Sequence, residues 1–302
     1  MELTSGKTAV VTGAASGIGF ALAERFARAG LNIVLADIEQ EALDAAEQRI
    51  AALGVQTLAV RTDVSDEESV QTLALAAVER FGAVHLVCNN AGVESSADPW
   101  LGPISAWKWV LGVNLWGVIH GIRAFLPVML GQGEGHFVNT ASIAGLYPGF
   151  APSYDASKHG VVAISEGLYR SMKLAGLPIG VSVLCPGWVN TNIMDAARNW
   201  PAALGEQPPQ ALGAEIAEPH VRKAIAEAIQ PAEVAAYVAD AVAGDKFWVF
   251  TGQEWVDLVV QRWNGIAAGQ DPQLDLQAPG MPPTAEIAAE IKNLLAQMLG
   301  GE

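Results

Sequence analysis

The chain has 302 residues, of which 51% are hydrophobic and 16% charged, enough to bury the core of one large α/β domain or two small ones. Its formal net charge of −15 and its lack of a Lys/Arg run argue against nucleic acid or an anionic membrane as a partner. We expect no signal peptide, no membrane span of roughly 20 apolar residues and no zinc site. Cys88 and Cys185 each end an apolar run, so they are expected to be buried thiols in a reducing cytoplasm.

A glycine-rich segment, Gly13–Gly19, follows a strand pattern at Thr8–Thr12 and precedes a helical pattern. In this setting Gly13 permits a tight turn, Gly17 lets the backbone approach a ligand, and Gly19 allows the helix to pack closely on the strand. The N–H groups at the positive end of the helix then favour a pyrophosphate. The alternative is a glycine-rich turn without a ligand.

An acidic residue, Asp37, ends the second strand pattern at 32–36. At about 20 residues beyond a glycine loop, a carboxylate can accept a hydrogen bond from the ribose 2′-hydroxyl of NAD and would repel a 2′-phosphate. No basic residue follows at the next two positions, and Ser16 rather than Arg or Lys precedes Gly17. The sequence therefore favours NAD over NADP, although Asp37 could also cap the next helix.

Helical and strand patterns alternate along the rest of the chain. We predict helices over 39–53, 66–81, 104–129, 153–176 and 231–244, and strands over 56–61, 84–88, 135–141, 180–185 and 246–250. Pro127 is expected to interrupt the long helix near its end. The alternation predicts an α/β fold of the Rossmann type, a doubly wound parallel sheet of about seven strands with helices on both faces. Ligands then bind beyond the carboxyl ends of the strands.

Residues 1–252 are predicted to form one catalytic domain, in which the proline-interrupted segment 192–230 is a lid of short helices and loops. Residues 253–302 are predicted to be a C-terminal helical extension rather than an independent domain. It comprises a helix over 253–267, a linker with prolines, and an amphipathic helix whose apolar face carries Ile287, Ile291, Leu294, Leu295 and Met298. The extension either covers the pocket or builds a subunit interface.

Tyr154 and Lys158 are four residues apart and share one face of the predicted helix over 153–176. A nearby positive charge favours the phenolate and lowers the pKa of tyrosine from about 10. The pair can therefore supply a proton acceptor near neutral pH. This spacing is common on helices, so its meaning depends on the rest of the chain.

Several motifs stand in the order seen in the short-chain dehydrogenases/reductases, which the chain resembles over residues 5–252. They are Thr12-Gly13-Ala14-Ala15-Ser16-Gly17-Ile18-Gly19, Asn89-Asn90-Ala91-Gly92, Asn114, Ser142, Tyr154-x-x-x-Lys158 and Pro186-Gly187. Ser142 precedes Tyr154 by twelve residues, which also fits that family.

The resemblance implies that Tyr154 is the general acid/base and that Lys158 lowers its pKa and holds the nicotinamide ribose. Ser142 would hydrogen-bond the substrate oxygen, and Asn114 would anchor a water relay. The implied NAD contacts are Gly13, Ser16, Gly17, Ile18, Gly19, Asp37, Asp63, Val64, Asn90, Ala91, Gly92, Tyr154, Lys158, Pro186, Gly187, Val189 and Thr191. As alternatives, Ser142 could cap a turn, Asn114 could be a buried helix residue, and Thr191 could cap a helix.

The candidates for the substrate pocket are apolar or aromatic and include no Arg or Lys. They are Val93, Leu146, Tyr147, Phe150, Trp188, Met194 and Trp200, with Trp100 and Leu101 beside them. They favour a small hydrophobic secondary alcohol or ketone of aryl, terpenoid or steroid-like kind, although several could instead be core residues. By resemblance, we expect a homodimer or homotetramer.

Three functions are compatible with these features. The first is an NAD-dependent secondary-alcohol dehydrogenase. The second is an NADP-dependent reductase of a ketone, imine or alkene. The third is a nucleotide-sensing protein without turnover, against which the set Ser142, Tyr154 and Lys158 argues.

Overall fold

The computed structural model describes residues 1–149 and 151–298, and its parallel strands form one sheet in the order β3-β2-β1-β4-β5-β6-β7. The strands are β1 Thr8–Thr12, β2 Asn32–Asp37, β3 Thr57–Arg61, β4 Leu86–Asn89, β5 Gly135–Thr140, β6 Ile179–Cys185 and β7 Trp248–Phe250. The predicted α/β class is confirmed. The strand order reverses between β1 and β4, and in such sheets the ligand crevice lies at this point.

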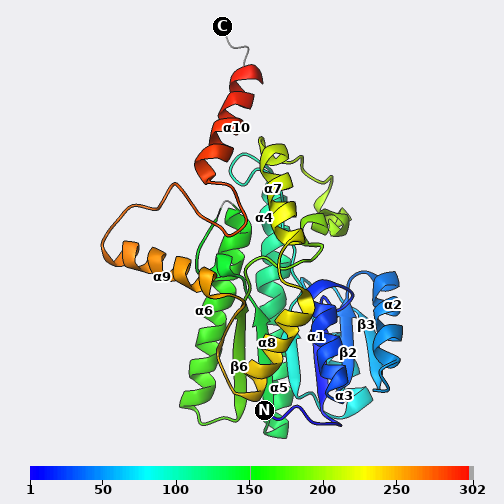
Figure 1. Cartoon of the computed structure of the whole chain (residues 1–302). Helices are drawn as coiled ribbons and strands as arrows, with labels where there is room; N and C mark the ends of the chain where they lie inside the picture. Colours follow the sequence, from blue (N-terminus) through cyan, green and yellow to red (C-terminus); the bar gives the residue numbers. More distant parts are fainter. Residues whose placement is uncertain (150, 299–302) are drawn as a thin grey trace.

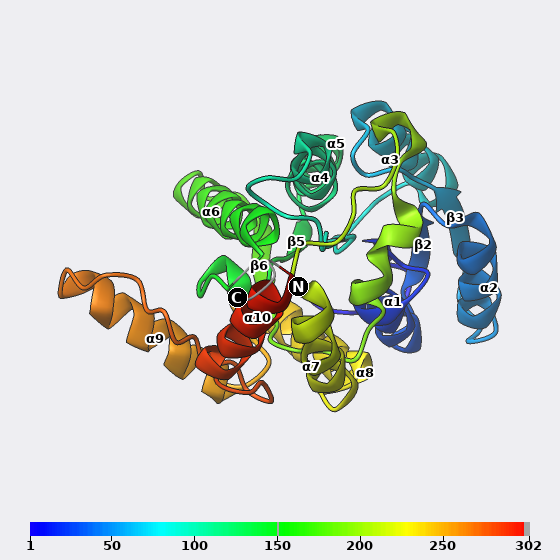
Figure 2. The same ribbon diagram turned by 90° about the horizontal axis from the view of Figure 1, so that it is seen from above.

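Helices cover both faces of the sheet (Figures 1 and 2). One face carries α1 Gly17–Arg28, α2 Gln40–Ala51 and α8 Pro231–Ala243, and the other carries α3 Glu67–Phe81, α5 Gly117–Gln132 and α6 Pro152–Leu174. Successive side chains of β1 alternate between the two faces of the sheet. Ala9 and Val11 belong to the core under α1, α2 and α8, Val10 belongs to the core under α3, α5 and α6, and all three are fully buried. The free thiols of Cys88 and Cys185 are buried, as expected.

The helix predicted over 104–129 is two helices joined by a wider turn: α4 Ile104–Leu111, the π-helical η1 Gly112–Trp116, and α5. The prediction that Pro127 interrupts the end was wrong, because α5 continues to Gln132 and ends at a left-handed Gly133 with φ +80°. Pro127 removes the donor for the carbonyl of Arg123. Arg123 is exposed, so water can replace that bond.

By length and composition alone, the run Ile104–Gln132 could cross a membrane, contrary to the expectation from sequence. Of its most apolar stretch, 44% is buried inside the protein. The run packs against α3, α6, β4 and β5. A helix in the core of a globular domain passes the same test, and these contacts are of that kind.

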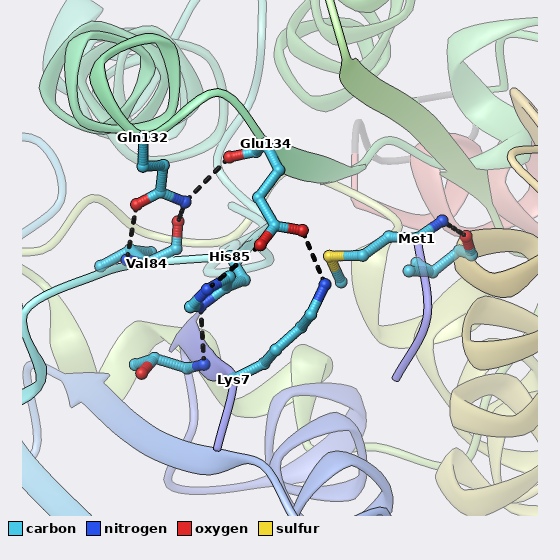
Figure 3. Close-up of polar contacts among 8 residues, drawn as sticks. Met1, Lys7, Val84, His85, Gln132 and Glu134 are labelled. Carbon is cyan, nitrogen blue, oxygen red and sulfur yellow. Dashed lines mark hydrogen bonds and ion pairs between the residues drawn. The ribbon is translucent and has the colours of Figure 1, made fainter. Parts of the chain in front are cut away.

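A polar cluster joins the amino ends of β1, β4 and β5 (Figure 3). Lys7 Nζ pairs with Glu134 Oε2 at 2.7 Å, and Gln132 Nε2 donates to the carbonyl of Val84 at 2.7 Å. His85 Nδ1 accepts from the N–H of the first β1 residue at 3.0 Å, and burial lowers its pKa. His85 therefore has a structural role at the end of the sheet opposite the crevice.

Candidate active site

The glycine loop has the geometry of an anion-binding turn. Gly13 and Gly17 are left-handed, with φ +66° and +52°. A Cβ on Gly19 would lie 2.0 Å from the carbonyl oxygen of Gly13, so only glycine fits there. Ser16 is the N-cap of α1, and its side chain makes no capping hydrogen bond. The first N–H groups of α1 can therefore be offered to a phosphate.

Asn90 ties the strands together behind this loop. Its side chain donates to the carbonyl of Thr12 at 3.0 Å and accepts from the Thr140 hydroxyl at 3.2 Å. Thr12 Oγ1 in turn accepts from the N–H groups of Asn90 at 2.9 Å and Ala91 at 3.1 Å. These bonds fix the carboxyl ends of β1, β4 and β5 relative to one another.

Asp37 braces the glycine loop. Its Oδ2 accepts from the N–H of Ala15 at 2.9 Å, and its Oδ1 accepts from the N–H of Glu39 at 3.1 Å. Burial raises the pKa of Asp37, and these two bonds oppose the rise. The N-cap of α2 is Glu39 rather than Asp37. Each carboxylate oxygen keeps a lone pair that can accept a ribose hydroxyl.

Two arginines approach this end of β2, although neither is adjacent in sequence. Arg61 Nε donates to the carbonyl of Ile38 at 3.2 Å. Arg198, from the lid helix η3 Ile193–Asn199, pairs with Glu39 Oε1 at 2.8 Å, and Asn199 donates to the same oxygen at 2.8 Å. Although burial opposes it, these bonds lower the pKa of Glu39. The lid is thus latched to the end of β2.

Of the other implied cofactor residues, Thr191 lies near the glycine loop and Gly187 contacts the C-terminal extension. Thr191 lies beside the glycine loop, with its methyl carbon 3.2 Å from where a Cβ of Gly17 would stand, and Asn192 is the cap of η3 instead. Gly187 packs on Trp255, whose ring lies 2.0 Å from the position of a Gly187 Cβ. The contacts of Gly187 are therefore with α9 Gln253–Ala267.

Four further residues have contacts within the protein. Asp63 Oδ1 accepts from the N–H and hydroxyl of Ser65, at 2.9 and 2.7 Å. Val64 is buried and its carbonyl lies 3.0 Å from a ring nitrogen of His120. The carbonyl of Pro186 accepts from Ile143 at 2.8 Å, and Val189 is buried.

The catalytic candidates meet at the start of α6. Lys158 Nζ lies 5.4 Å from the centroid of the Tyr154 ring and donates to the carbonyl of Thr140 at 3.0 Å. The Ser142 side chain adjoins the Tyr154 phenol and lowers its pKa. Ser142 Oγ also accepts from the N–H of Ala144 at 3.1 Å, so it caps a turn as well. Lys158 is only 2% exposed, which fixes its ammonium near the phenol.

The electrostatics of Tyr154 differ from the sequence-based expectation. Burial is the main cause that raises its pKa, the charge of Glu94 raises it further, and the bond from Ser142 lowers it. The pKa of Lys158 is itself lowered to about 8 by burial. The phenol is therefore held in its protonated form, and a phenolate requires an additional positive charge in the crevice.

Asn114 lies in the π-helical turn η1 and is fully buried. Its side chain donates to the carbonyl of Val93 at 2.9 Å and to Ser157 Oγ at 3.1 Å, and accepts from the N–H of Val93 at 2.8 Å. This matches the alternative of a buried residue bonded to backbone. A Cβ on Gly92 would stand 3.5 Å from both the Asn114 and Lys158 side chains, so these two residues flank Gly92.

A cavity of about 40 Å³ lies under the lid, little more than the space of one water molecule. The predicted residues Met194 and Trp200 line it, and Val93 and Tyr154 belong to the adjoining apolar cluster. Trp109 of α4 lies edge-on to Trp200, with centroids 5.2 Å apart.

Sequence reasoning missed most of the cavity lining. The missed residues are Glu94, Ser95, Ser96, Ala97, Trp109, Ile193, Ala197, Gln207 and Pro208. Their signal is position, since residues 94–97 lie in the loop that begins at the carboxyl end of β4. Trp100 and Leu101 were wrong as lining residues, because they are 74% and 92% exposed. A larger open hollow of about 750 Å³, beside Arg28 and Gly54, contains none of the predicted site residues.

The C-terminal extension packs against the core on the face of the sheet that carries α3, α5 and α6. Trp188 Nε1 donates to the carbonyl of Pro279 at 2.9 Å, and Leu276 packs against the cluster that contains Leu146 and Tyr147. The helix α10 Thr284–Met298 contacts α7 Ala214–Ala226 of the lid (Figures 1 and 2). These contacts favour a covering role for the extension. Phe150, also predicted here, lies outside the described residues.

Comparison with known proteins agrees with this geometry. The family model for short chain dehydrogenases matches residues 7–202. A 1-deoxy-11-beta-hydroxypentalenate dehydrogenase of Streptomyces avermitilis is 38% identical over 266 residues, covering 86% of this chain and 89% of that protein.

Two solved structures are similar over most of the chain. A short-chain dehydrogenase/reductase from Burkholderia phymatum in complex with NAD is 41% identical, with a TM-score of 0.88 over 92% of this chain and 100% of that one. An actinorhodin polyketide ketoreductase variant with NADPH is 30% identical, with a TM-score of 0.69 over 82% of this chain and 97% of that one. The chain therefore belongs to the short-chain dehydrogenase family, and its relatives support alcohol dehydrogenase or ketone reductase activity.

Proposed function

We propose that this protein is an NAD-dependent oxidoreductase that interconverts a hydrophobic secondary alcohol and its ketone. The observation that carries the proposal is the convergence of Tyr154, Ser142 and Lys158 at the carboxyl end of β5, on the crevice side of the glycine loop. A nucleotide sensor without turnover would not need this set.

The residues divide the chemistry of alcohol oxidation. Tyr154 takes the proton of the alcohol hydroxyl while the C–H bond of the carbinol carbon breaks and the C=O bond forms. Ser142 hydrogen-bonds the substrate oxygen and stabilises its developing charge. Lys158 uses one N–H on Thr140 and has two left for ribose hydroxyls. When bound, oxidised NAD supplies the hydride acceptor and a positive charge, and the charge favours the phenolate of Tyr154.

The Asp37 carboxylate supports the preference for NAD. It stands at the end of β2, where a 2′-phosphate would meet it. Glu39 and Arg198 pair with each other, so their charges cancel. The relative from Burkholderia phymatum was solved with NAD. Arg61, beside Ile38, is the observation that keeps NADP as the second candidate.

The apolar lid supports a hydrophobic substrate. Trp109, Met194 and Trp200 face the cavity, and a relative is named for a hydroxylated pentalenate. We also infer a homodimer or homotetramer, supported by Trp116 of η1, which is 53% exposed in the single chain.

A screen of aliphatic, benzylic, terpenoid and steroid alcohols with each oxidised nucleotide tests the proposal. We expect NADH formation with a hydrophobic secondary alcohol and a kcat/KM at least about tenfold higher with NAD than with NADP, as loss of a charged hydrogen bond implies. Higher kcat/KM with NADP would contradict the nucleotide assignment. If none of the alcohols yields reduced nucleotide, the proposed reaction class is contradicted.

The latch between the lid and β2 leads to a second prediction. Replacing Arg198 with alanine removes its ion pair with Glu39, in which both side chains are partly exposed. Such pairs contribute about 0.2–1 kcal/mol, so NADH should dissociate up to about fivefold faster. Stopped-flow fluorescence measures this rate. As the control, Arg28→Ala breaks a pair on α1 away from the lid and should leave the rate unchanged. An unchanged rate in Arg198→Ala would show that the latch does not retain the nucleotide.

A further inference from the structure

Glu94 is a carboxyl group in the wall of the cavity under the lid. It lies in the loop that follows β4, immediately after Gly92 and Val93, and its side chain is partly buried. Among the lining residues that the structure describes, it alone carries a charge. Over residues 1–149 and 151–298, no hydrogen bond or ion pair engages its carboxyl oxygens.

A carboxyl group that lines a cavity and has no hydrogen-bond partner in the protein can accept a hydrogen bond from a ligand. Burial and then the charge of Asp155 raise the pKa of Glu94 to about 7. Asp155 is itself bonded to the N–H of Gly149 at 3.0 Å. A titratable group in a cavity whose pKa is shifted by burial and by a nearby charge is a candidate for contact with a ligand.

The position of Glu94 is well defined relative to the reacting atoms. The preceding residue, Val93, is held on both its N–H and its carbonyl by Asn114, which also bonds Ser157 of α6. Ser157 in turn donates to the carbonyl of Tyr154 at 2.6 Å, and the charge of Glu94 acts on the phenol of Tyr154. One set of hydrogen bonds therefore fixes both Glu94 and the catalytic tyrosine.

We propose that Glu94 forms a polar subsite that accepts a hydrogen bond from a second group on the substrate, a hydroxyl or an ammonium. The substrate class is then a hydrophobic secondary alcohol that carries an additional hydrogen-bond donor close to the reacting carbon. A carboxylate at the same place would be repelled by Glu94 and Asp155. This inference rests on the proposed oxidoreductase function.

Matched benzylic alcohols test the subsite. In one series, the carbon next to the carbinol carries a methyl, a hydroxyl or an ammonium group, and in the other the para position of the ring carries a methyl or a hydroxyl group. The wild type should show a kcat/KM about tenfold higher or more for the donor-bearing alcohol of at least one series, as a hydrogen bond to a charged group implies.

Two variants separate hydrogen bonding from charge. Glu94→Leu should bring the ratio of donor to methyl analogue close to one. Glu94→Gln should keep part of the preference for hydroxyl and lose the preference for ammonium, because the amide oxygen accepts a hydrogen bond without a charge. As the control, Glu79→Gln on the exposed face of α3 should leave every ratio unchanged. A residue with only a structural role would change all analogues alike.

The outcomes distinguish the two claims. If the wild type oxidises the methyl analogues and treats the donor-bearing ones no better, the subsite is refuted and the oxidoreductase function stands. A preference that persists in Glu94→Leu refutes the subsite as well. If no secondary alcohol yields NADH although the protein binds the nucleotide, the oxidoreductase function is refuted, and the subsite is refuted with it.

Discussion

Replacing Tyr154 with phenylalanine is expected to lower kcat for alcohol oxidation by about 10²–10⁴-fold, the usual contribution of a general acid/base. The phenol adjoins Ser142, and Lys158 Nζ lies over its ring, 5.4 Å from the centroid. Phenylalanine keeps the ring and its packing against Val93 and Trp109. The dissociation constant of NADH, read by fluorescence titration, should therefore stay nearly unchanged.

A second tyrosine on the same helix provides the control. Tyr169 lies on α6 and packs on Phe247, with ring centroids 5.0 Å apart, away from the crevice. Tyr169→Phe should retain the kcat of the wild type. If Tyr154→Phe turned over alcohol at a comparable rate, the proton would have to leave by another group, and the assignment of Tyr154 would be wrong.

Replacing Gly19 with alanine is expected to weaken NADH binding by more than about a hundredfold. The new methyl group would stand 2.0 Å from the carbonyl oxygen of Gly13 and 2.7 Å from the side-chain nitrogen of Asn90. Both partners are fixed, since Asn90 is bonded to Thr12 and Thr140. The loop must therefore shift away from the geometry that offers its N–H groups to the pyrophosphate. Fluorescence titration with NADH measures the loss.

The same substitution at Gly167 should stabilise the protein and leave NADH binding unchanged. Gly167 lies on the exposed face of α6, where a Cβ meets open space. Gly167→Ala should raise the free energy of unfolding by about 0.5–1 kcal/mol, because glycine loses more backbone entropy in a helix, and it should leave NADH binding unchanged. If Gly19→Ala bound NADH as tightly as Gly167→Ala, the glycine loop would not be the pyrophosphate site.

The parts of the site that could be predicted from sequence are those encoded by local spacing. The glycine loop, Ser142 and the pair Tyr154/Lys158 each sit at a strand end or on one helix turn, so short-range geometry is enough to bring their groups together. Asp37 is predicted at the cofactor because it ends the second strand about 20 residues beyond the glycine loop, and it does contact Ala15 of that loop.

The unpredicted parts depend on contacts between distant segments. Glu39 and Arg198 are 159 residues apart, so no sequence window contains their pair. Trp100 is as apolar as Trp200, but composition does not say which one faces solvent. The pKa of Tyr154 depends on burial and on Glu94, and neither follows from the spacing to Lys158. Long-range packing thus decides the chemistry that local motifs only outline.

Transfer of a deuterium atom tests the central claim most directly. The wild type is incubated with NAD and a hydrophobic secondary alcohol that carries deuterium on its carbinol carbon, and the NADH formed is analysed by mass spectrometry and NMR. The account predicts deuterium at C4 of the nicotinamide in the wild type and none above background in Tyr154→Phe. Undeuterated NADH, or no NADH from any alcohol in a protein that binds the nucleotide, would contradict it.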